Sequence, residues 1–358
     1  MKPDNSINIS GTEIGKDTSA YFIADIAANH DGDLQRAIDL IYLAAEAGAD
    51  AAKFQHFKAD TIVSDQGFKS MGKQSSHQAK WQKSVFEVYQ DASVDLGWTP
   101  SLKEACDKAG IHFFTSPYAH DLVDAVDPYV PAYKIGSGDI TWLEIIEHIA
   151  GKNKPYIIAS GASTFDDVQR AVDAALKINT QVALLQCNTN YTASLENFKY
   201  IQLNVLRSYR EMYPEMVLGL SDHTPGHATV LGAIALGAKI IEKHFTDDTS
   251  RIGPDHGFSM DPKTWREMID RSRELEYSLG AGCKKVEGNE TETVILQRRS
   301  IRLAQDLPEG TVLTRDHINV LRPCPKDALQ PYQINEIIGK RLRRELKSGD
   351  HLKWGDID

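Results

Sequence analysis

Two histidines follow neighbouring apolar segments in the second half of the chain. His223 comes shortly after the run at residues 217–219, and His244 comes shortly after the run at 238–242. If both runs are strands of one parallel sheet, the two imidazoles meet at the same edge and could hold a divalent metal, with water or substrate oxygens in the other positions. This ligand set favours Mn²⁺, with Mg²⁺ or Co²⁺ as alternatives. The competing interpretation is that one histidine only forms a hydrogen bond there.

Two lysines, Lys53 and Lys134, lie inside apolar segments. A buried ammonium group needs a nearby anion to offset its loss of water. Serines at the ends of such segments would add hydroxyl donors, namely Ser116, Ser137, Ser160 and Ser221. Two cations and several hydroxyls predict a pocket for a small phosphate or carboxylate. A Schiff-base role for Lys53, as in a keto-acid aldolase, is the rival hypothesis.

Four carboxylates stand at the ends of the same kind of segment, namely Asp25, Asp139, Glu242 and Asp255. We expect some of them to bind sugar hydroxyls and one to move a proton. The competing interpretation is that a carboxylate such as Glu242 only pairs with a lysine. The sixth apolar segment is followed by three further candidates, Asn188, Thr189 and Tyr191.

Eight short apolar segments alternate with helical patterns between residues 21 and 279. The strand candidates cover residues 21–26, 51–55, 112–115, 132–135, 156–159, 182–186, 217–219 and 238–242. Eight strand–helix units of this total length predict an α/β fold of the (β/α)8 TIM-barrel type, whose active site lies at the carboxyl ends of the strands. A doubly wound open sheet is the alternative, but no glycine-rich dinucleotide turn follows the first strand.

The pattern changes near residue 280, which predicts more than one domain. We expect an N-terminal extension at 1–20, a catalytic barrel at 21–280, a polar linker at 281–296 and a small β-rich domain at 297–358. The connection at 57–96, between the second strand and its helix, is longer than a barrel requires. It is either a functional lid or a surface excursion.

Composition disfavours several classes of protein. Lys and Arg number 40 against 50 Asp and Glu, a net charge of −10, and no basic run is present, so nucleic-acid binding is disfavoured. The longest apolar run, residues 230–241, is too short to cross a membrane, and residues 1–15 are too polar for a secretory signal. Four scattered cysteines fit reduced thiols, so we expect a cytoplasmic protein.

Several short motifs carry a resemblance to a known family. They are IAANHDG at 26–32, AKFQ at 52–55, YKIGSGD at 133–139, GLSDHT at 219–224, EKHFT at 242–246 and GPD at 253–255. Together they resemble the sialic-acid (N-acetylneuraminate) synthase family, and the likeness spans nearly the whole chain. The tail, with LPEGT at 307–311 and KSGD at 347–350, resembles the antifreeze-like (SAF) domain that follows the barrel in that family.

The resemblance implies condensation of phosphoenolpyruvate with the open-chain aldehyde of an N-acylated amino-hexose, giving a sialic-acid-type nonulosonic acid and phosphate. The metal would be held by His223 and His244. Phosphoenolpyruvate would be bound by Lys53, Ser116, Lys134, Ser137, Ser160 and Ser221, with Asn188 and Thr189 as further candidates. The carboxylates implied in catalysis are Asp25, Asp139 and Glu242. The sugar would be faced by Asp25, Tyr191 and Asp255.

Family members are domain-swapped homodimers, in which the antifreeze-like domain caps the barrel of the partner. The resemblance therefore implies that Arg322 reaches the sugar bound by the other subunit. Two departures bear on the substrate. The family usually has Glu where this chain has Asp25 and Asp139, and the segment QCNTNY at 186–191 does not keep the usual His-Cys-Thr-Asn order.

The identity of the sugar therefore stays open at this point. Withdrawing a carboxylate by one C–C bond changes which sugar substituent it reaches. The candidates are N-acetylmannosamine and a diacetamido-trideoxyhexose that leads to a legionaminic- or pseudaminic-type acid. The alternative outside enzymology is a polysaccharide-binding protein without catalytic activity.

Overall fold

The larger compact unit of the chain, Met1–Gly280, is built on eight parallel strands. The computed structural model describes residues 1–71, 78, 81 and 83–358. The strands are β3 (Tyr21–Asp25), β4 (Ala51–His56), β5 (His112–Pro117), β6 (Tyr133–Ile135), β7 (Tyr156–Ala159), β8 (Val182–Cys187), β9 (Val217–Asp222) and β10 (Ile240–His244). Their order is β5-β4-β3-β10-β9-β8-β7-β6, and β5 lies beside β6, so the sheet curves into a nearly closed barrel. The predicted (β/α)8 fold is confirmed.

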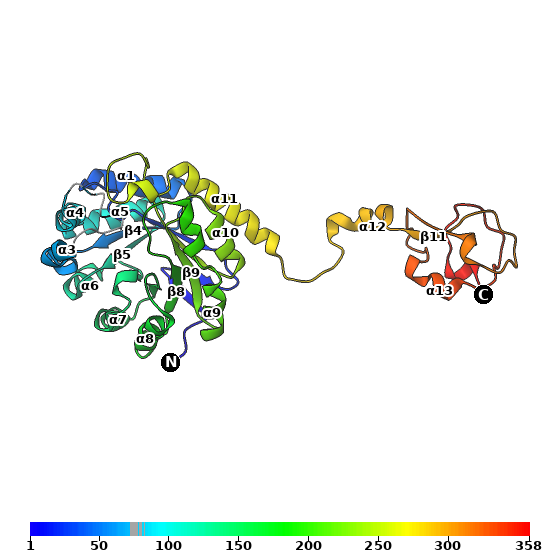
Figure 1. Ribbon diagram of the computed structural model, residues 1–358, viewed down its shortest axis with the longest axis horizontal. Coiled ribbons are helices and arrows are strands. Elements are labelled where there is room, and N and C mark those ends of the chain that lie inside the picture. Colours follow the sequence, from blue (N-terminus) through cyan, green and yellow to red (C-terminus); the bar gives the residue numbers. More distant parts are fainter. Residues whose placement is uncertain (72–77, 79–80, 82) are drawn as a thin grey trace. The chain divides into compact units, whose positions relative to one another are not determined.

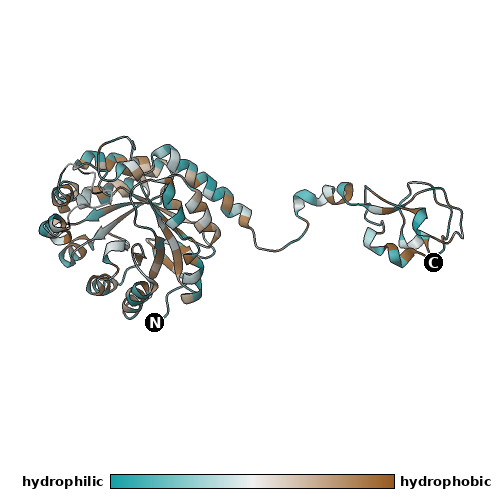
Figure 2. Cartoon of the chain, in the orientation of Figure 1, coloured by the Kyte–Doolittle hydropathy of each residue, from teal (hydrophilic) through white to brown (hydrophobic). Residues whose placement is uncertain are grey.

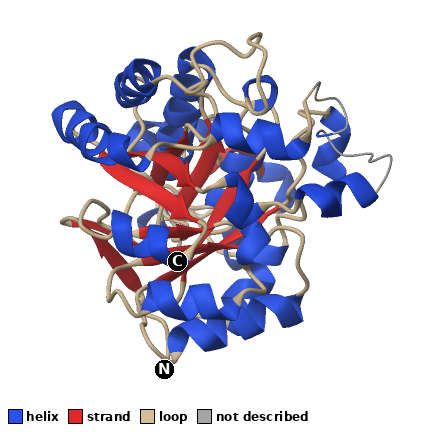
Figure 3. Ribbon diagram, turned by 90° about the vertical axis from the view of Figure 1, so that its left-hand side faces the viewer, coloured by secondary structure: helices blue, strands red, loops and turns tan. Residues whose placement is uncertain are grey.

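Helices follow the strands and form the outer layer (Figures 1 and 3). They are α1 (Leu34–Glu46), α5 (Thr99–Ala109), α6 (His120–Val126), α7 (Leu143–Ala150), α8 (Phe165–Leu176), α9 (Val205–Met212), α10 (Ala228–Ala235) and α11 (Pro262–Leu279). Side-chain caps start several of them; the Thr164 hydroxyl, for example, accepts from the amide of Asp167 in a capping box. Among the described residues, no helix has the length and apolar character needed to cross a bilayer.

Strand residues alternate between two hydrophobic cores. One set faces the helices, and Figure 2 shows the hydrophobic residues concentrated on the strands and on the inner sides of the helices. The other set fills the barrel interior and includes Ile23, Ala51, Phe114, Leu185 and Ile240. Because side chains along a strand alternate faces, this inner set fixes which residues nearer the carboxyl ends point into the barrel mouth.

A β-hairpin covers the amino-terminal ends of the barrel strands. Strands β1 (Ser6–Ile9) and β2 (Thr12–Gly15) pair antiparallel within the segment that the sequence indicated only as an extension. Ile7, Ile9 and Ile14 are buried in the same cluster as the inner barrel residues. The hairpin therefore closes the end of the barrel opposite the mouth, where an apolar interior would otherwise meet water.

The long connection after β4 contains three short helices. These are α2 (Ala59–Ile62), α3 (Asp65–Ser70) and α4 (Val85–Ala92), followed by the 3-10 turn η2 (Leu96–Trp98). Residues 72–77, 79–80 and 82 of this connection lie outside the described part of the chain, so the sequence-based interpretation as a lid is tested only on the rest.

The remainder of the chain, Ala281–Asp358, forms a second compact unit. Helix α12 (Thr291–Gln297) precedes an antiparallel pair, β11 (Ser300–Leu303) and β12 (Ile318–Leu321). The segments at 307–311 and 338–342 of this predicted β-rich domain are not regular strands; their backbones form single bridges such as Leu307 with Leu346. Leucines and isoleucines from these turns make a small core of their own.

Shortening a buried side chain of the β1–β2 hairpin should destabilise the barrel. We expect Ile9→Ala to lower the free energy of unfolding by about 2–4 kcal/mol, because it removes a fully buried side chain from a packed core. Urea denaturation followed by circular dichroism measures this. Ile252→Ala is the control, since Ile252 is fully exposed and should unfold like the parent protein. Equal unfolding of the Ile9→Ala variant and the parent would contradict the role of the hairpin.

Candidate active site

Polar side chains occupy the inward positions at the carboxyl ends of the strands. They continue the alternation of the inner cluster and are Asp25, Lys53, Gln55, Ser116, Lys134, Cys187, Ser221, Glu242 and His244. The registers set residues of neighbouring strands side by side; Asp25 lies beside Lys53, and Ser221 lies beside Glu242. The mouth therefore gathers groups that are far apart in the sequence.

Two lysines and two carboxylates form a buried ionic cluster. The ammonium of Lys53 lies 2.7 Å from Asp25 Oδ2 and 3.9 Å from Glu242 Oε1. The ammonium of Lys134 lies 3.5 Å from the same Glu242 oxygen. Burial lowers the pKa of Lys134, and the charge of Lys53 lowers it further. For Lys53, burial acts in the same direction, but Asp25 and Glu242 outweigh it and raise its pKa.

Unsatisfied oxygen atoms lie beside this cluster. Ser221 Oγ donates to Glu242 Oε1 at 3.2 Å, whereas Glu242 Oε2 and the hydroxyl of Ser116 are buried without a hydrogen-bond partner among the described residues. Buried polar atoms are normally paired, so these two atoms point to a ligand with its own donors and acceptors. With two ammonium groups adjacent, an anion is the ligand that fits.

The loop after β7 approaches the mouth through a glycine. Gly161 donates its amide to Ser137 Oγ at 3.0 Å. A side chain at this position would meet the Thr189 hydroxyl at 1.9 Å and the Cys187 sulfur at 3.0 Å. Only glycine leaves room for these side chains so close to the backbone, and the approach brings Ser137 and Thr189 to one wall.

The two predicted metal ligands lie side by side. The ring centroids of His223 and His244 are 5.4 Å apart. His223 Nδ1 is 3.1 Å from the carbonyl oxygen of Asn188, which can only accept, so Nε2 is left with the lone pair that a metal requires. Nδ1 of His244 is buried without a hydrogen-bond partner among the described residues. These two imidazoles fit one divalent cation.

In the part of the chain that the structure describes, these two imidazoles are the clear ligand pair. No group of three or more His, Cys, Asp or Glu side chains able to hold a metal is found in the described ranges. The remaining coordination positions would therefore belong to water and substrate, as in a catalytic rather than a structural metal site. Asp255 comes nearest, with Oδ2 at 3.9 Å from His244 Nδ1.

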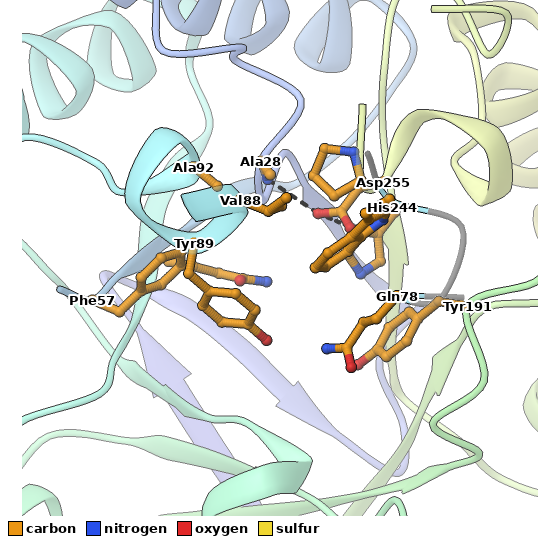
Figure 4. A pocket seen from close by; sticks show the side chains of 12 residues that line it. Ala28, Phe57, Gln78, Val88, Tyr89, Ala92, Tyr191, His244 and Asp255 are labelled. Carbon is orange, nitrogen blue, oxygen red and sulfur yellow. Dashed lines mark hydrogen bonds and ion pairs between the residues drawn. The ribbon is translucent and has the colours of Figure 1, made fainter. Parts of the chain in front are cut away.

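Asp139 and Asp255 are the two remaining predicted carboxylates. Burial raises the pKa of each to about 6. Asp255 Oδ2 accepts a hydrogen bond from the amide of Ala28 at 3.2 Å, drawn as a dashed line in Figure 4. Asp139 follows β6 in the short turn η3 (Ser137–Asp139) and has Lys134 as its nearby cation. Four carboxylates thus surround two ammonium groups.

A cavity of about 120 Å³ opens between His244 and the long connection (Figure 4). Its walls include Asp255 and Tyr191 from the barrel loops, and Tyr89 and Trp81 from the connection. The hydroxyl of Tyr89 points into the space facing Tyr191. The described part of the 57–96 connection therefore lines the candidate site.

Two predicted residues lie differently from the rest. The hydroxyl of Ser160 faces outward, donating to the Leu185 carbonyl at 2.9 Å and accepting from Tyr209 of α9 at 2.8 Å. Its place in an anion pocket stays a prediction that this geometry does not favour. Arg322 belongs to the unit Ala281–Asp358, which is described by itself.

Sequence reasoning missed Cys187 as a site residue. Its side chain is buried in the mouth, where contact with His223 outweighs burial and lowers the pKa of the thiol. The signal was available, since Cys187 shares the inward alternation of Ala183 and Leu185. Phe258 was also missed; its ring lies 4.8 Å from that of His244, and no pattern in the sequence distinguishes it.

Comparison with known proteins shows which family the chain belongs to. Residues 40–284 match the NeuB family, and residues 298–358 match the SAF domain. The chain belongs to the NeuB family. Membership confirms the resemblance to sialic-acid synthases and the prediction of an enzyme, as well as the antifreeze-like tail.

Relatives of this NeuB family member cover almost its entire length. A Legionella pneumophila protein named N,N'-diacetyllegionaminic acid synthase is 34% identical over 96% of both chains. A Campylobacter jejuni pseudaminic acid synthase is 31% identical over 95% of this chain and 97% of its own. The crystal structure of N-acetylneuraminic acid synthetase from Leptospira borgpetersenii, in complex with citrate, matches with a TM-score of 0.70 and 26% identity, covering 82% of this chain and 96% of that one.

Removing the charge of Asp139 should stabilise the protein at neutral pH. The folded-state pKa of about 6 exceeds the ordinary value of 3.8, so the native state favours the protonated acid. This contribution is complete below pH 3.8 and is lost as the pH rises through 6. The difference corresponds to at most about 3 kcal/mol, and solvent screening of this half-buried group reduces it to about 1–2 kcal/mol.

We therefore expect Asp139→Asn to raise the free energy of unfolding at pH 8, with a gain that shrinks towards pH 4.5. Urea titrations at both pH values measure it. Asp17→Asn is the control, because that side chain is 87% exposed. A gain that is absent at pH 8, or that does not depend on pH, would contradict the burial argument.

Proposed function

We propose that this NeuB family member condenses phosphoenolpyruvate with the open-chain aldehyde of an N-acylated amino-hexose, giving a nonulosonic acid and phosphate. The observation that carries the proposal is the meeting of two imidazoles and two buried ammonium groups in one barrel mouth. The names of the relatives, which are synthases of legionaminic and pseudaminic acids, support the same class of product.

In this proposal, the lysine and serine wall binds phosphoenolpyruvate. Lys53 and Lys134 neutralise part of its charge, and the unpaired hydroxyl of Ser116 donates to a phosphate or carboxylate oxygen. Thr189 and Ser137 lie beside Gly161 on the neighbouring wall and would extend this pocket. Phosphate leaves by C–O cleavage, so the pocket needs donors that bind phosphate without attacking phosphorus. Hydroxyls and ammonium groups meet that requirement.

His223 and His244 would hold a divalent cation, with Mn²⁺ as the expected metal. When bound, the cation supplies Lewis-acid polarisation of the aldehyde oxygen. The charge balance of the mouth supports this assignment. Two ammonium groups face four carboxylates before any substrate arrives, so a highly charged anion such as phosphoenolpyruvate needs a further cation beside it.

The carboxylates would act on the enol ester and on water. Attack of the enol carbon on the aldehyde leaves positive charge on the neighbouring carbon, and an anionic Glu242 or Asp139 stabilises it. Glu242 Oε2 is unpaired and available to orient a water towards that carbon. Asp25 is held by Lys53 at 2.7 Å, which fixes it as an acceptor towards the sugar.

For the sugar, we propose a diacetamido-trideoxyhexose rather than N-acetylmannosamine. The support is the likeness to the Legionella protein and the presence of aspartate at positions 25 and 139, where the shorter side chain leaves room for a different substituent. We further propose a cytoplasmic, domain-swapped homodimer in which Arg322 contacts the sugar in the partner's barrel.

The Schiff-base alternative is less well supported. A lysine nucleophile must lose its proton, whereas Asp25 and Glu242 raise the pKa of Lys53. A protein that only binds polysaccharide does not account for a buried cluster of catalytic groups, and the relatives are named synthases.

The purified protein should release phosphate from phosphoenolpyruvate only when a suitable sugar and metal are present. We would incubate it with Mn²⁺ and a panel of N-acyl hexosamines that includes N-acetylmannosamine and 2,4-diacetamido-2,4,6-trideoxyhexoses, and measure phosphate and product mass. We expect the diacetamido sugars to be used best and EDTA to abolish turnover.

Two results of this panel would contradict the proposal. The first is an absence of phosphate release with every sugar and metal. The second is trapping of a pyruvate adduct on Lys53 by borohydride, which would establish the aldolase instead.

Loss of either imidazole should remove metal binding and activity together. We expect His223→Ala and His244→Ala each to lower kcat/KM by at least about 10³-fold, because several kcal/mol of transition-state stabilisation disappear. Isothermal titration with Mn²⁺ should show weakened binding, while circular dichroism stays unchanged. His148→Ala, in an exposed pair with Asp124, is the control. Full Mn²⁺ binding by both variants would remove these residues from the metal site.

A further inference from the structure

A network of charged and polar groups joins two loops behind the candidate sugar site. One loop is the turn at residues 27–33, which follows β3, and the other is the loop at 245–261, which follows β10. Residues of the second loop, among them Pro254 and Asp255, line the mouth cavity. Neither the anion pocket nor the metal pair uses this network, so its role is separate from both.

Asp31 is the centre of the network. Its carboxylate accepts from Arg251 Nη2 at 2.7 Å and is 2.9 Å from His256 Nε2 and 3.1 Å from Arg36 Nε. The backbone of Asp31 has φ of 51° and that of Ala27 has φ of 44°, values that non-glycine residues rarely adopt. Such a turn persists only when its surroundings hold it, and these contacts do so.

Arg36 ties both loops to helix α1. Its Nε donates to the carbonyl of Asn29 at 2.7 Å, and its two terminal nitrogens donate to the two oxygens of Asp247 at 2.8 and 2.6 Å. A bidentate pair of this kind fixes direction as well as distance. The guanidinium is largely buried, and its contacts lie within the protein.

His256 connects the second loop to the same centre from inside. Its ring is fully buried between the Thr246 hydroxyl, at 2.7 Å from Nδ1, and Asp31. Gly253 packs directly on this ring, since a side chain there would lie 2.6 Å from His256 Cδ2. The loop that carries Asp255 is therefore held on both sides of that residue.

The network ends at Asp255. The side-chain amide of Asn29 donates to the Phe245 carbonyl and to Ser259 Oγ, both at 2.9 Å, and Ser259 Oγ donates to the Asp255 carbonyl at 2.7 Å. The amide of Ala28 donates to one carboxylate oxygen of Asp255, as Figure 4 shows. Contacts from the turn at 27–33 thus hold both the backbone and the side chain of Asp255 in position.

We propose that Arg36 and Asp31 are positioning residues, which lock the 245–261 loop onto the 27–33 turn and so hold Asp255 towards the bound sugar. The link to the sugar rests on the function proposed above, whereas the lock itself rests only on the contacts. Neither side chain needs to touch substrate. Their loss should weaken binding of the sugar but not of phosphoenolpyruvate, because the proposed lysine and serine ligands of phosphoenolpyruvate lie within or directly after other strands.

The test compares Arg36→Met and Arg36→Lys with the parent protein. Arg36→Met keeps an unbranched aliphatic side chain but removes the hydrogen bonds to Asn29 and Asp247 and the ion pair with Asp31. Hydrogen–deuterium exchange should become faster in residues 245–258, with the other barrel loops unchanged. The KM for the sugar should rise roughly 10- to 100-fold while the KM for phosphoenolpyruvate stays within about twofold. Arg36→Lys should recover part of both effects.

Two further variants sharpen the comparison. Asp247→Asn weakens the bidentate pair with a side chain of the same shape, and it serves if Arg36→Met does not fold. Arg170→Met removes an exposed pair with Asp167 on α8 and should leave both exchange and kinetics unchanged.

The outcomes separate the lock from the proposed reaction. Unchanged exchange at 245–258 in the Arg36 and Asp247 variants would overturn the lock, whatever the enzyme does. Faster exchange with an unchanged sugar KM would overturn the positioning role. If the parent protein used no sugar at all, the proposed function would fail, and the exchange data would still decide the lock.

Discussion

Burial of two ammonium groups inside the barrel mouth is the constraint on which the rest of the site depends. Each buried ion costs several kcal/mol of hydration, which only nearby opposite charge can offset. Asp25 supplies that charge because the register of β3 and β4 sets it beside Lys53, and Glu242 supplies it by reaching from β10 through the barrel interior to the lysines on β4 and β6. Ser116 Oγ and Glu242 Oε2 have no hydrogen-bond partner among the described residues, which points to a ligand beside the cluster. Stability of the mouth and ligand binding are therefore coupled.

The two ends of the barrel differ in what they contribute to stability and to ligand binding. The hairpin β1–β2 closes one end by packing isoleucine side chains against the apolar barrel interior. At the other end, His244 is the last residue of β10, His223 and Asp255 lie on the loops after β9 and β10, and the long connection adds aromatic walls. Because apolar packing stabilises the hairpin end of the barrel, the mouth can retain closely spaced charges.

The likeness to legionaminic and pseudaminic acid synthases has a physical counterpart in where the residues sit. The lysines and Ser116, which we propose bind the anion, lie on strands, where register leaves little freedom. The residues that we propose face the sugar lie mostly on loops, held by contacts such as those of Asp31 and Arg36. Loops change more readily than strands, so one reaction can be kept while the sugar varies.

The sequence by itself determined the eight strands, because each is a short apolar run punctuated by turn residues, and it identified the strand ends as the site. It also placed His223, His244, Lys53 and Lys134 together, since parallel strands end at one rim. Only the tertiary structure decided which strand-end residues point inward. Alternation turns Ser160 towards Tyr209 and Cys187 into the mouth, and it hides Lys243 in a buried pair with Asp222. The hairpin and the Asp31 network arise from contacts between segments distant in the chain, and such contacts leave no local period in the sequence.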